Sequence, residues 1–195
     1  MPGHKGLLGP SGIGGFVMNE EMNKALTPLI AGGTGSLSHT EFMPDFLPDR
    51  FEAGTMNLPG LAGLHAALGF LSETGMDAIR AHEAALTERF LAALRPMAAE
   101  GRVRLLGLPG ADGRTGVVSI QTPGRDPACT AEALDTRFGI QTRVGLHCAP
   151  SAHRTLGTFP TGTLRFSFGW FNTEADIDAA AAALDLLTRE DAHGL

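Results

Sequence analysis

The stretch Pro2-Gly3-His4-Lys5-Gly6, which continues as LLGPSGIGG from Leu7 to Gly15, decides how the rest of the chain is interpreted. It places a lysine between glycines, just before apolar leucines and a turn. Backbone that packs closely around such a lysine excludes water, which disfavours the ammonium form and makes the amine a nucleophile. The simpler alternative is an ordinary surface lysine. On this stretch alone, both interpretations stand.

The composition is that of a globular protein that handles a small molecule. The 195 residues are 43% hydrophobic and 18% charged, which is enough for one core or two small ones. The formal net charge is -6, and Lys and Arg form no cluster. Because a nucleic-acid surface needs a basic face, we expect no nucleic-acid partner.

The sequence lacks membrane and signal segments and a disulfide framework, and these absences give the expected location and the expected state of the cysteines. No apolar run approaches the length of a membrane span, and the start has no basic and then apolar signal pattern. We therefore expect no membrane association and a cytoplasmic location. The two cysteines, Cys129 and Cys148, make no disulfide framework, so each is judged as a thiol. Cys129, near the start of a predicted helix, is expected to be a small buried residue.

The first part of the chain is broken by glycine and proline. Residues 15–18 are predicted to form a short buried strand, and residues 26–31 another short apolar element. The amides and hydroxyls of Gly32-Gly33-Thr34-Gly35-Ser36 would either line a phosphate pocket or form a loop.

Two helices are predicted next. The first runs from Leu58 to Glu73, because a proline suits its first turn and leucines recur at helical spacing. Thr55, just before it, would bind a phosphate at the helix N-terminus or act as the capping residue. The second helix runs from Asp77 to Leu94, and Pro96 should end or kink it.

The remainder predicts a compact α+β domain of order αββαββα. Its cleanest alternation puts Leu164, Phe166 and Phe168 on one face of a strand, so Arg165 points away from the core. The other elements are strands at 103–106, 116–121 and 141–144, a helix at 126–138, and a final helix that starts at Thr173 and Asp176 and packs through Ile177, Ala181 and Leu184.

Cys148 lies in a loop bracketed by Gly145 and Pro150, where a thiol can reach into a pocket. His147 and Arg143 would favour its thiolate form electrostatically. A metal site made of His147, Cys148 and His153 is the competing interpretation. It offers three ligands and no second cluster, so we prefer the thiol and expect no metal.

Five stretches, in this order, resemble the class V aminotransferase family, in particular its cysteine desulfurase and selenocysteine lyase branch. They are the lysine segment, FEAGTMNLPG (Phe51 to Gly60), the helix pair after it, RVGLHCAP (Arg143 to Pro150) and LRFSFGWFNT (Leu164 to Thr173). The resemblance covers nearly the whole chain. In the family the lysine lies about halfway along, whereas here it is the fifth residue, so the chain resembles the C-terminal half of such an enzyme.

The resemblance implies an α/β fold: the C-terminal half of a fold type I transferase that depends on pyridoxal 5'-phosphate (PLP). Residues 1–57 would be a remnant of the PLP-binding large domain, with the lysine turn and dimer-facing loops. Residues 58–75 would be a connecting helix, and residues 76–195 the C-terminal small α+β domain.

The resemblance also implies a site. Lys5 would bind PLP covalently and move the substrate's α proton, His4 would contact the cofactor phosphate, and Thr55 would reach the phosphate of the other subunit of a homodimer. Cys148 would take the sulfur of a cysteine or selenocysteine substrate as a persulfide and leave alanine. Arg165, with Arg143 as a second candidate, would bind the substrate carboxylate. A sulfur-acceptor protein would be a further partner.

Part of such a site has no counterpart in the sequence. In the family, the group that stacks on the cofactor ring, the aspartate at its nitrogen and the rest of the phosphate loop come from the half before the lysine. Two alternatives therefore stay open. The chain would be a non-catalytic fragment or complementing subunit, or it would belong to another class V enzyme (aminotransferase, selenocysteine lyase or epimerase) in which Cys148 is incidental.

Overall fold

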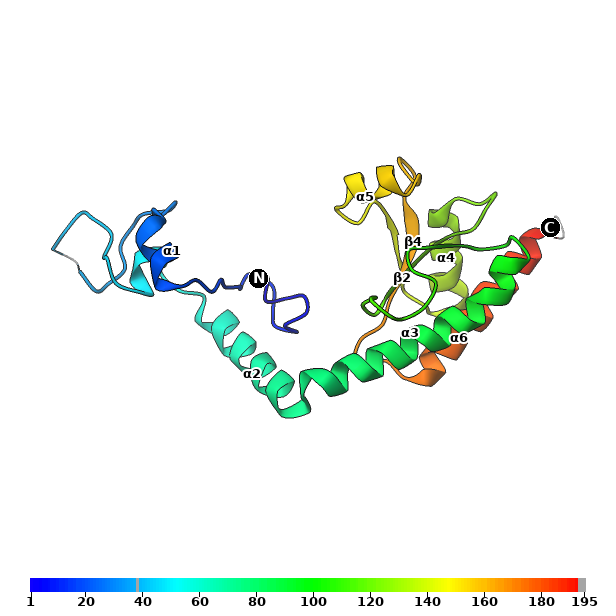
Figure 1. Ribbon diagram of the computed structural model, residues 1–195, viewed down its shortest axis with the longest axis horizontal. Helices are drawn as coiled ribbons and strands as arrows, with labels where there is room; N and C mark the ends of the chain where they lie inside the picture. The colour runs from blue at the N-terminus through cyan, green and yellow to red at the C-terminus, as the bar shows by residue number, and fades with distance from the viewer. Residues whose placement is uncertain (38, 193–195) are drawn as a thin grey trace. The chain divides into compact units, whose positions relative to one another are not determined.

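The computed structural model describes residues 1–37 and 39–192. The chain forms two compact units, Met1–Gly75 and Met76–Leu195, which we call the lysine unit and the sheet unit. In Figure 1 the lysine unit runs from blue to cyan and the sheet unit from green to red. None of the helices in the described part of the chain is both long and apolar enough to cross a membrane.

The lysine unit has little regular structure before its last helix. It contains the short helix α1 (Glu20–Ala25), the 3-10 turn η1 (Asp49–Phe51) and the helix α2 (Leu58–Thr74). Sequence analysis missed α1, which begins after Asn19, whose side-chain oxygen accepts a hydrogen bond from the Met22 amide at 2.8 Å.

The two apolar elements predicted in the lysine unit are wrong. Residues 15–18 form no strand, and Phe16 and Val17 are 61% and 87% exposed. Leu29 and Ile30, in the second stretch, are 99% and 72% exposed. Apolar residues in a sequence predict a surface that needs covering, and the described part of the lysine unit leaves these side chains largely exposed.

The predicted helix at residues 58–73 is confirmed as α2. Its N-terminus is capped by Asn57, whose side-chain oxygen accepts a hydrogen bond from the Gly60 amide at 3.1 Å. The alternative that Thr55 caps this helix is therefore wrong. The helix ends at Gly75, which has a positive φ of 85°.

The sheet unit has the predicted order αββαββα, with one short helix added. Its strands form one antiparallel sheet in the order β1-β2-β4-β3. The elements are α3 (Met76–Ala99), β1 (Arg104–Leu106), β2 (Val117–Gln121), α4 (Pro127–Phe138), β3 (Arg143–Gly145), the added α5 (Pro150–Thr155), β4 (Thr163–Ser167) and α6 (Glu174–Ala192).

The prediction that Pro96 ends or kinks the second helix near Leu94 is wrong about the end, because α3 continues to Ala99. Proline lacks the amide hydrogen that would bond the carbonyl one turn earlier. Since Pro96 lies in the last turn, only one such bond is lost. The Glu100 amide still bonds to the Pro96 carbonyl at 3.0 Å, which closes that turn.

The core lies where α3, α4 and α6 pack on one face of the sheet (Figure 1). Phe90 of α3 is fully buried, and its ring centroid lies 4.7 Å from that of Phe166 and 5.1 Å from that of Phe168. Within the described residues, every buried hydrophobic side chain except Leu71 belongs to the sheet unit. This unit therefore has its own core.

We predict that Phe90→Ala lowers the free energy of unfolding of the sheet unit by about 3–5 kcal/mol, because it removes a buried ring and leaves a cavity. Phe171→Ala is the matched control, since Phe171 is 76% exposed, and should cost less than about 1 kcal/mol. Urea unfolding followed by circular dichroism measures both. Equal losses in the two variants would contradict this description of the core.

Candidate functional site

The lysine turn is a closed loop. Its ends are tied where Pro2 bridges Gly14, and the Gly3 amide bonds to the Ile13 carbonyl at 2.8 Å. Inside it, the Gly9 amide bonds to the Gly3 carbonyl at 2.8 Å. A side chain at Gly3 would place its Cβ 2.7 Å from the Ile13 oxygen, so only glycine allows this approach. The backbone thus fixes the shape of the turn.

The lysine turn also packs on α2. A Cβ at Gly63 would meet the Pro10 ring at 2.9 Å, so glycine lets the turn lie directly against the helix. Asn57, besides capping α2, donates from its side-chain amide to the Gly12 carbonyl at 3.3 Å. The same asparagine therefore fixes both the start of the helix and the turn that carries Lys5.

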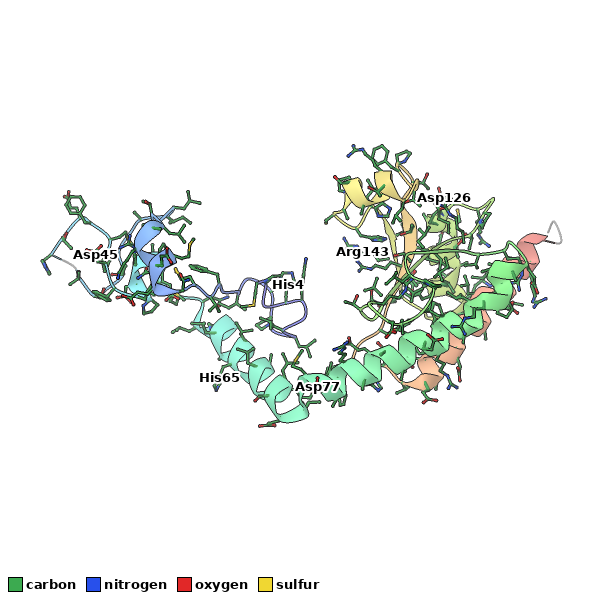
Figure 2. The ribbon with its side chains drawn as sticks, in the orientation of Figure 1. His4, Asp45, His65, Asp77, Asp126 and Arg143 are labelled. Atoms are coloured by element: carbon green, nitrogen blue, oxygen red, sulfur yellow. The ribbon has the colours of Figure 1, made fainter. Side chains whose placement is uncertain are left out.

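Lys5 itself is exposed, and so are His4, labelled in Figure 2, and Thr55. The expectation that tight backbone removes water from Lys5 is wrong for this structure, because the glycines pack below the turn and leave the side chain free. Within the described part of the chain, no hydrogen bond or ion pair engages the side chains of these three residues. They are available to a ligand.

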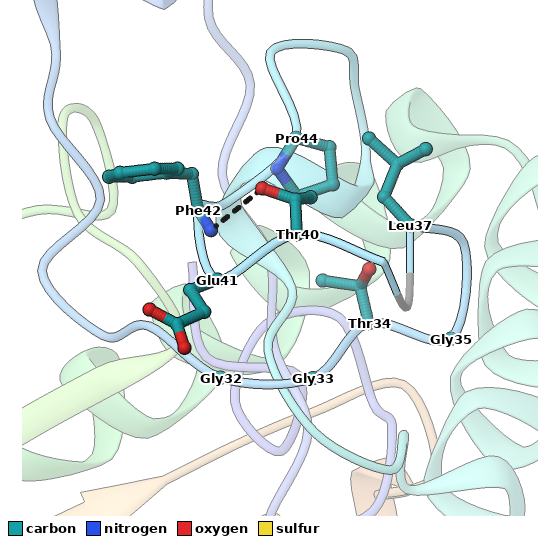
Figure 3. A pocket seen from close by; sticks show the side chains of 9 residues that line it. All are labelled: Gly32, Gly33, Thr34, Gly35, Leu37, Thr40, Glu41, Phe42 and Pro44. Atoms are coloured by element: carbon teal, nitrogen blue, oxygen red, sulfur yellow. Dashed lines mark hydrogen bonds between the residues drawn. The ribbon is translucent and has the colours of Figure 1, made fainter.

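Residues 32–35 of the glycine-rich stretch line a cavity of about 420 Å³ (Figure 3). Figure 3 shows Gly32 to Gly35 along one side and Thr40 to Phe42 along the other. The Thr34 and Ser36 hydroxyls bond to each other at 2.8 Å. Glu41 also lines the cavity, and its negative charge would repel a phosphate. The structure therefore favours the loop interpretation over the anion pocket.

In the sheet unit, strand pairing brings the two predicted arginines together. Arg143 of β3 lies directly opposite Arg165 of β4 (Figure 2 labels Arg143). Leu164 and Phe166, on either side of Arg165, are buried in the core, so the arginines lie on the other face of the sheet. Like charges placed opposite each other destabilise a sheet, whereas an anion between them would be bound from both sides.

Cys148 follows this pair in a strained turn. After β3, His147 has a φ of 49° and Cys148 a φ of 61°, and α5 begins two residues later. The left-handed region costs a residue other than glycine about 1–3 kcal/mol, and such strain is concentrated at functional sites. The Cys148 side chain is exposed, as a reacting thiol requires. Cys129 is exposed too, so the expectation that it is buried is wrong.

The surroundings of His147 lower its pKa. Burial lowers the pKa most, and the charges of Arg165, His153 and Arg143 lower it further, while the bond to Thr163 acts in the opposite direction. This direction argues against a positively charged His147 as the group that favours the thiolate. Its Nε2 lies 3.2 Å from the Thr163 hydroxyl.

Two buried polar atoms at this place have no partner within the described residues: the His147 Nδ1 and the Arg165 Nε. Buried polar groups are nearly always hydrogen-bonded, so an unpaired group at a site indicates a missing ligand. A carboxylate offers the acceptors that an arginine Nε requires. The arrangement thus fits a small carboxylate ligand beside a thiol.

The alternative metal site has no support. No group of three His, Cys, Asp or Glu in residues 1–37 and 39–192 is placed to hold a metal ion. His153 is buried, and its Nδ1 lies 2.7 Å from the Thr158 hydroxyl. Sequence analysis considered His153 only as a metal ligand and missed Thr158 and Thr163. Thr158 lies in a turn and Thr163 begins β4, and neither position carries a sequence pattern that would have revealed its role.

Comparison with known proteins gives consistent results. The model of the aminotransferase class-V family matches residues 1–180. A probable cysteine desulfurase from Methanothermobacter thermautotrophicus is 33% identical over 187 residues, which are 94% of this chain and 46% of the relative. One from Halobacterium salinarum is 36% identical over 94% of this chain and 43% of the relative. The chain thus spans less than half the length of these relatives.

Solved structures agree. The apo structure of a cysteine desulfurase from Thermococcus onnurineus matches 97% of this chain and 46% of its own, with a TM-score of 0.85 and 31% identity. A cysteine desulfurase from Escherichia coli matches 97% of this chain and 45% of its own, with a TM-score of 0.79 and 30% identity. The mixed α/β fold and the family predicted from the motifs are confirmed. This chain belongs to the aminotransferase class V family, in its cysteine desulfurase branch.

Proposed function

We propose that this chain is the C-terminal part of a PLP-dependent cysteine desulfurase, which converts L-cysteine to L-alanine and takes up the sulfur on Cys148. One observation carries the proposal: Arg143 and Arg165 lie opposite each other beside the exposed turn of Cys148. Such an arrangement would suit a substrate carboxylate next to a thiol, in a chain of the cysteine desulfurase branch. The substrate class follows from that kinship.

The family uses PLP, and the residues present fit part of it. Lys5 offers an exposed amine on a rigid turn, which suits the covalent attachment of an aldehyde. His4, exposed in the same unit, would contact the phosphate, while Thr55, also exposed, would reach the phosphate of the second subunit. When bound, PLP supplies the electron sink that lets the substrate lose its α proton. Lys5 would take that proton.

The sulfur transfer balances on the chain's own thiol. The Cys148 thiolate attacks the sulfur of the bound cysteine, a sulfur–sulfur bond forms, and the carbon–sulfur bond of the substrate breaks. The substrate carbon keeps the bonding electrons and a proton replaces the sulfur, so alanine leaves and Cys148 holds a persulfide. Sulfur is oxidised and carbon reduced, and no outside oxidant is needed. A sulfur-acceptor protein would then receive the sulfur.

The arginines orient the substrate for this step. Arg165 lies on an inner strand and is half-buried. Arg143 lies on the edge strand β3 and is exposed. We assign the bidentate contact to the substrate carboxylate to Arg165, and a second, more solvated contact to Arg143.

The lysine unit carries an apolar surface that favours a second role, that of a complementing half. Val17, Leu29 and Ile30 are 87%, 99% and 72% exposed, and an apolar cavity of about 290 Å³ lies beside them, lined in part by Phe16 and Phe51. So large an exposed apolar surface marks an interface. We propose that it is covered by the part of the fold that full-length relatives have in addition to the matched part.

The domain arrangement proposed for the whole enzyme follows from this. Residues 1–57 would complete the large domain, residues 58–75 would connect, and residues 76–195 would form the small domain. The group stacked on the cofactor ring and the aspartate at its nitrogen would come from the remaining part of the fold. In a homodimer, Thr55 would reach the cofactor phosphate of the second subunit. Without that part, we expect this chain to bind PLP weakly.

The attachment of PLP to Lys5 is directly testable, because the sequence has only two lysines, Lys5 and Lys24. The chain is mixed with PLP, alone and with the unmatched part of the Methanothermobacter relative as a separate polypeptide, and then reduced with borohydride. Mass spectrometry should find the cofactor on the Lys5 peptide, absent in Lys5→Ala and unchanged in Lys24→Ala. A cofactor that stays bound in Lys5→Ala would refute the assignment.

Sulfur transfer is tested with the two cysteines of the chain. In the complemented protein given PLP and L-cysteine, Cys148→Ser should abolish the protein persulfide and the release of alanine. Cys129→Ser should change neither, because Cys129 lies on α4 and the proposal gives it no role. Persulfide labelling and alanine analysis are the measurements. Alanine release that continues in Cys148→Ser would favour another class V reaction.

The apolar surface predicts how the complementing part binds. Burying a leucine side chain is worth about 1.5–3 kcal/mol, so Leu29→Ser should raise the Kd for the unmatched part of the relative roughly tenfold or more. Leu186→Ser is the control, because Leu186 is partly exposed on α6 of the sheet unit, and should leave the Kd unchanged. Calorimetry measures both. If Leu29→Ser instead abolishes self-association of this chain, a second copy covers the surface.

A further inference from the structure

The turn that carries Cys148 is held by groups that the proposed sulfur transfer does not use. The Ala149 amide bonds to the Leu146 carbonyl at 2.8 Å and closes the turn. The ring of His147 is tied to β4 through Thr163, which is fully buried. Two consecutive left-handed residues persist only where their surroundings hold them. The turn also contacts α5, through the ring of His147.

That contact is made by His153, a buried histidine at the end of α5. Its ring lies 5.7 Å from the ring of His147, centroid to centroid, and it is only 6% exposed. Thr158, 2% exposed, holds it: the Thr158 hydroxyl lies 2.7 Å from Nδ1, and the Thr158 amide bonds to the His153 carbonyl at 2.8 Å. The histidine ring is fixed from one side and contacts the reactive turn on the other.

The hydroxyl of Thr158 binds the ring of His153 directly. The Thr158 oxygen lies 2.7 Å from Nδ1, and which of the two atoms donates depends on the tautomer of the ring. The same hydroxyl lies 3.4 Å from the His153 carbonyl. A packed aliphatic side chain would fill this space without any such bond. A buried histidine whose ring is hydrogen-bonded to a buried threonine indicates a more specific role than filling space.

We propose that His153 is a positioning residue for Cys148: fixed by Thr158, it packs against His147 and keeps the His147-Cys148 turn left-handed, which holds the thiol beside Arg143 and Arg165. The inference rests on the proposed function only in taking Cys148 as the reacting thiol. The contact between the rings of His147 and His153, whose centroids lie 5.7 Å apart, supports it.

The test uses the charge of the alkylating reagent as a measure of where the thiol lies. Iodoacetate carries a carboxylate and iodoacetamide does not, so a thiol held beside two arginines reacts with iodoacetate at a relatively higher rate. The rate ratio of the two reagents is measured for Cys148 in a Cys129→Ser background. Thr158→Val, which keeps the shape and removes the hydroxyl, should lower the ratio about threefold or more, as Arg165→Gln should.

Matched variants separate positioning from general loosening. Thr158→Ser keeps the hydroxyl and should restore the ratio. Thr155→Val makes the same change on α5, at an exposed threonine whose hydroxyl bonds only to the Ser151 carbonyl, and should leave the ratio unchanged. A folded Thr158→Val protein with the unaltered ratio would overturn the proposal. An equal fall of the rate ratio in Thr155→Val would also overturn the proposal.

A measurement on the unaltered chain applies if Thr158→Val fails to fold. NMR of the ring nitrogens should show a hydrogen bond between His153 Nδ1 and the Thr158 hydroxyl, and its absence would overturn the proposal. None of these measurements needs PLP or substrate. A lowered ratio in Thr158→Val with no cofactor on Lys5 would leave the inference standing while the proposed function fails. An unaltered ratio in Thr158→Val, with cofactor found on Lys5, would overturn the inference while the proposed function stands.

Discussion

The pairing of β4 between β2 and β3 is the constraint on which the candidate site depends. Along β4 every second side chain enters the core, so Leu164 and Phe166 are buried and Arg165 must lie on the opposite face. The register with β3 then places Arg143 opposite Arg165. A shift of one residue would put an arginine into the core, so the hydrophobic pattern that stabilises the sheet also fixes the site.

The two units are stabilised in different ways. The sheet unit buries aromatic and aliphatic side chains of its own against three helices, and its fold follows from its own sequence. Among its described residues, the lysine unit buries the hydrophobic side chain of Leu71 alone, and it keeps its turn through backbone bonds and glycines that allow close approach. Its apolar residues are directed outward. Such a segment has the character of a part that acquires its hydrophobic stabilisation from a larger body.

Local signals therefore predicted the sheet unit well and the lysine unit poorly. The helix at 126–138 was predicted from its ends, and in the structure Asp126 caps it and the left-handed Gly139 ends it. Thr173 and Asp176 form the reciprocal capping bonds that their spacing predicts. The prediction of a strand at residues 15–18 was wrong, because the hydrophobic pattern of a sequence does not tell whether another part of the protein covers the apolar side chains. The cap of α2 is Asn57 and not Thr55. This choice depends on the path of the backbone before the helix, which the spacing of residues in the sequence does not reveal.

The arginine pair shows why the site could be predicted in part only. Each arginine alone is an ordinary strand residue, and their pairing emerges from a register between segments more than twenty residues apart. Once formed, the pair is a poor way to stabilise a sheet, since two like charges face each other and Arg165 leaves its Nε buried without a partner among the described residues. Stability alone would favour other residues here. The unfavourable arrangement makes sense if an anion completes it, and a strained turn that presents a thiol at the same place indicates that this anion is the carboxylate of a molecule on which the thiol acts.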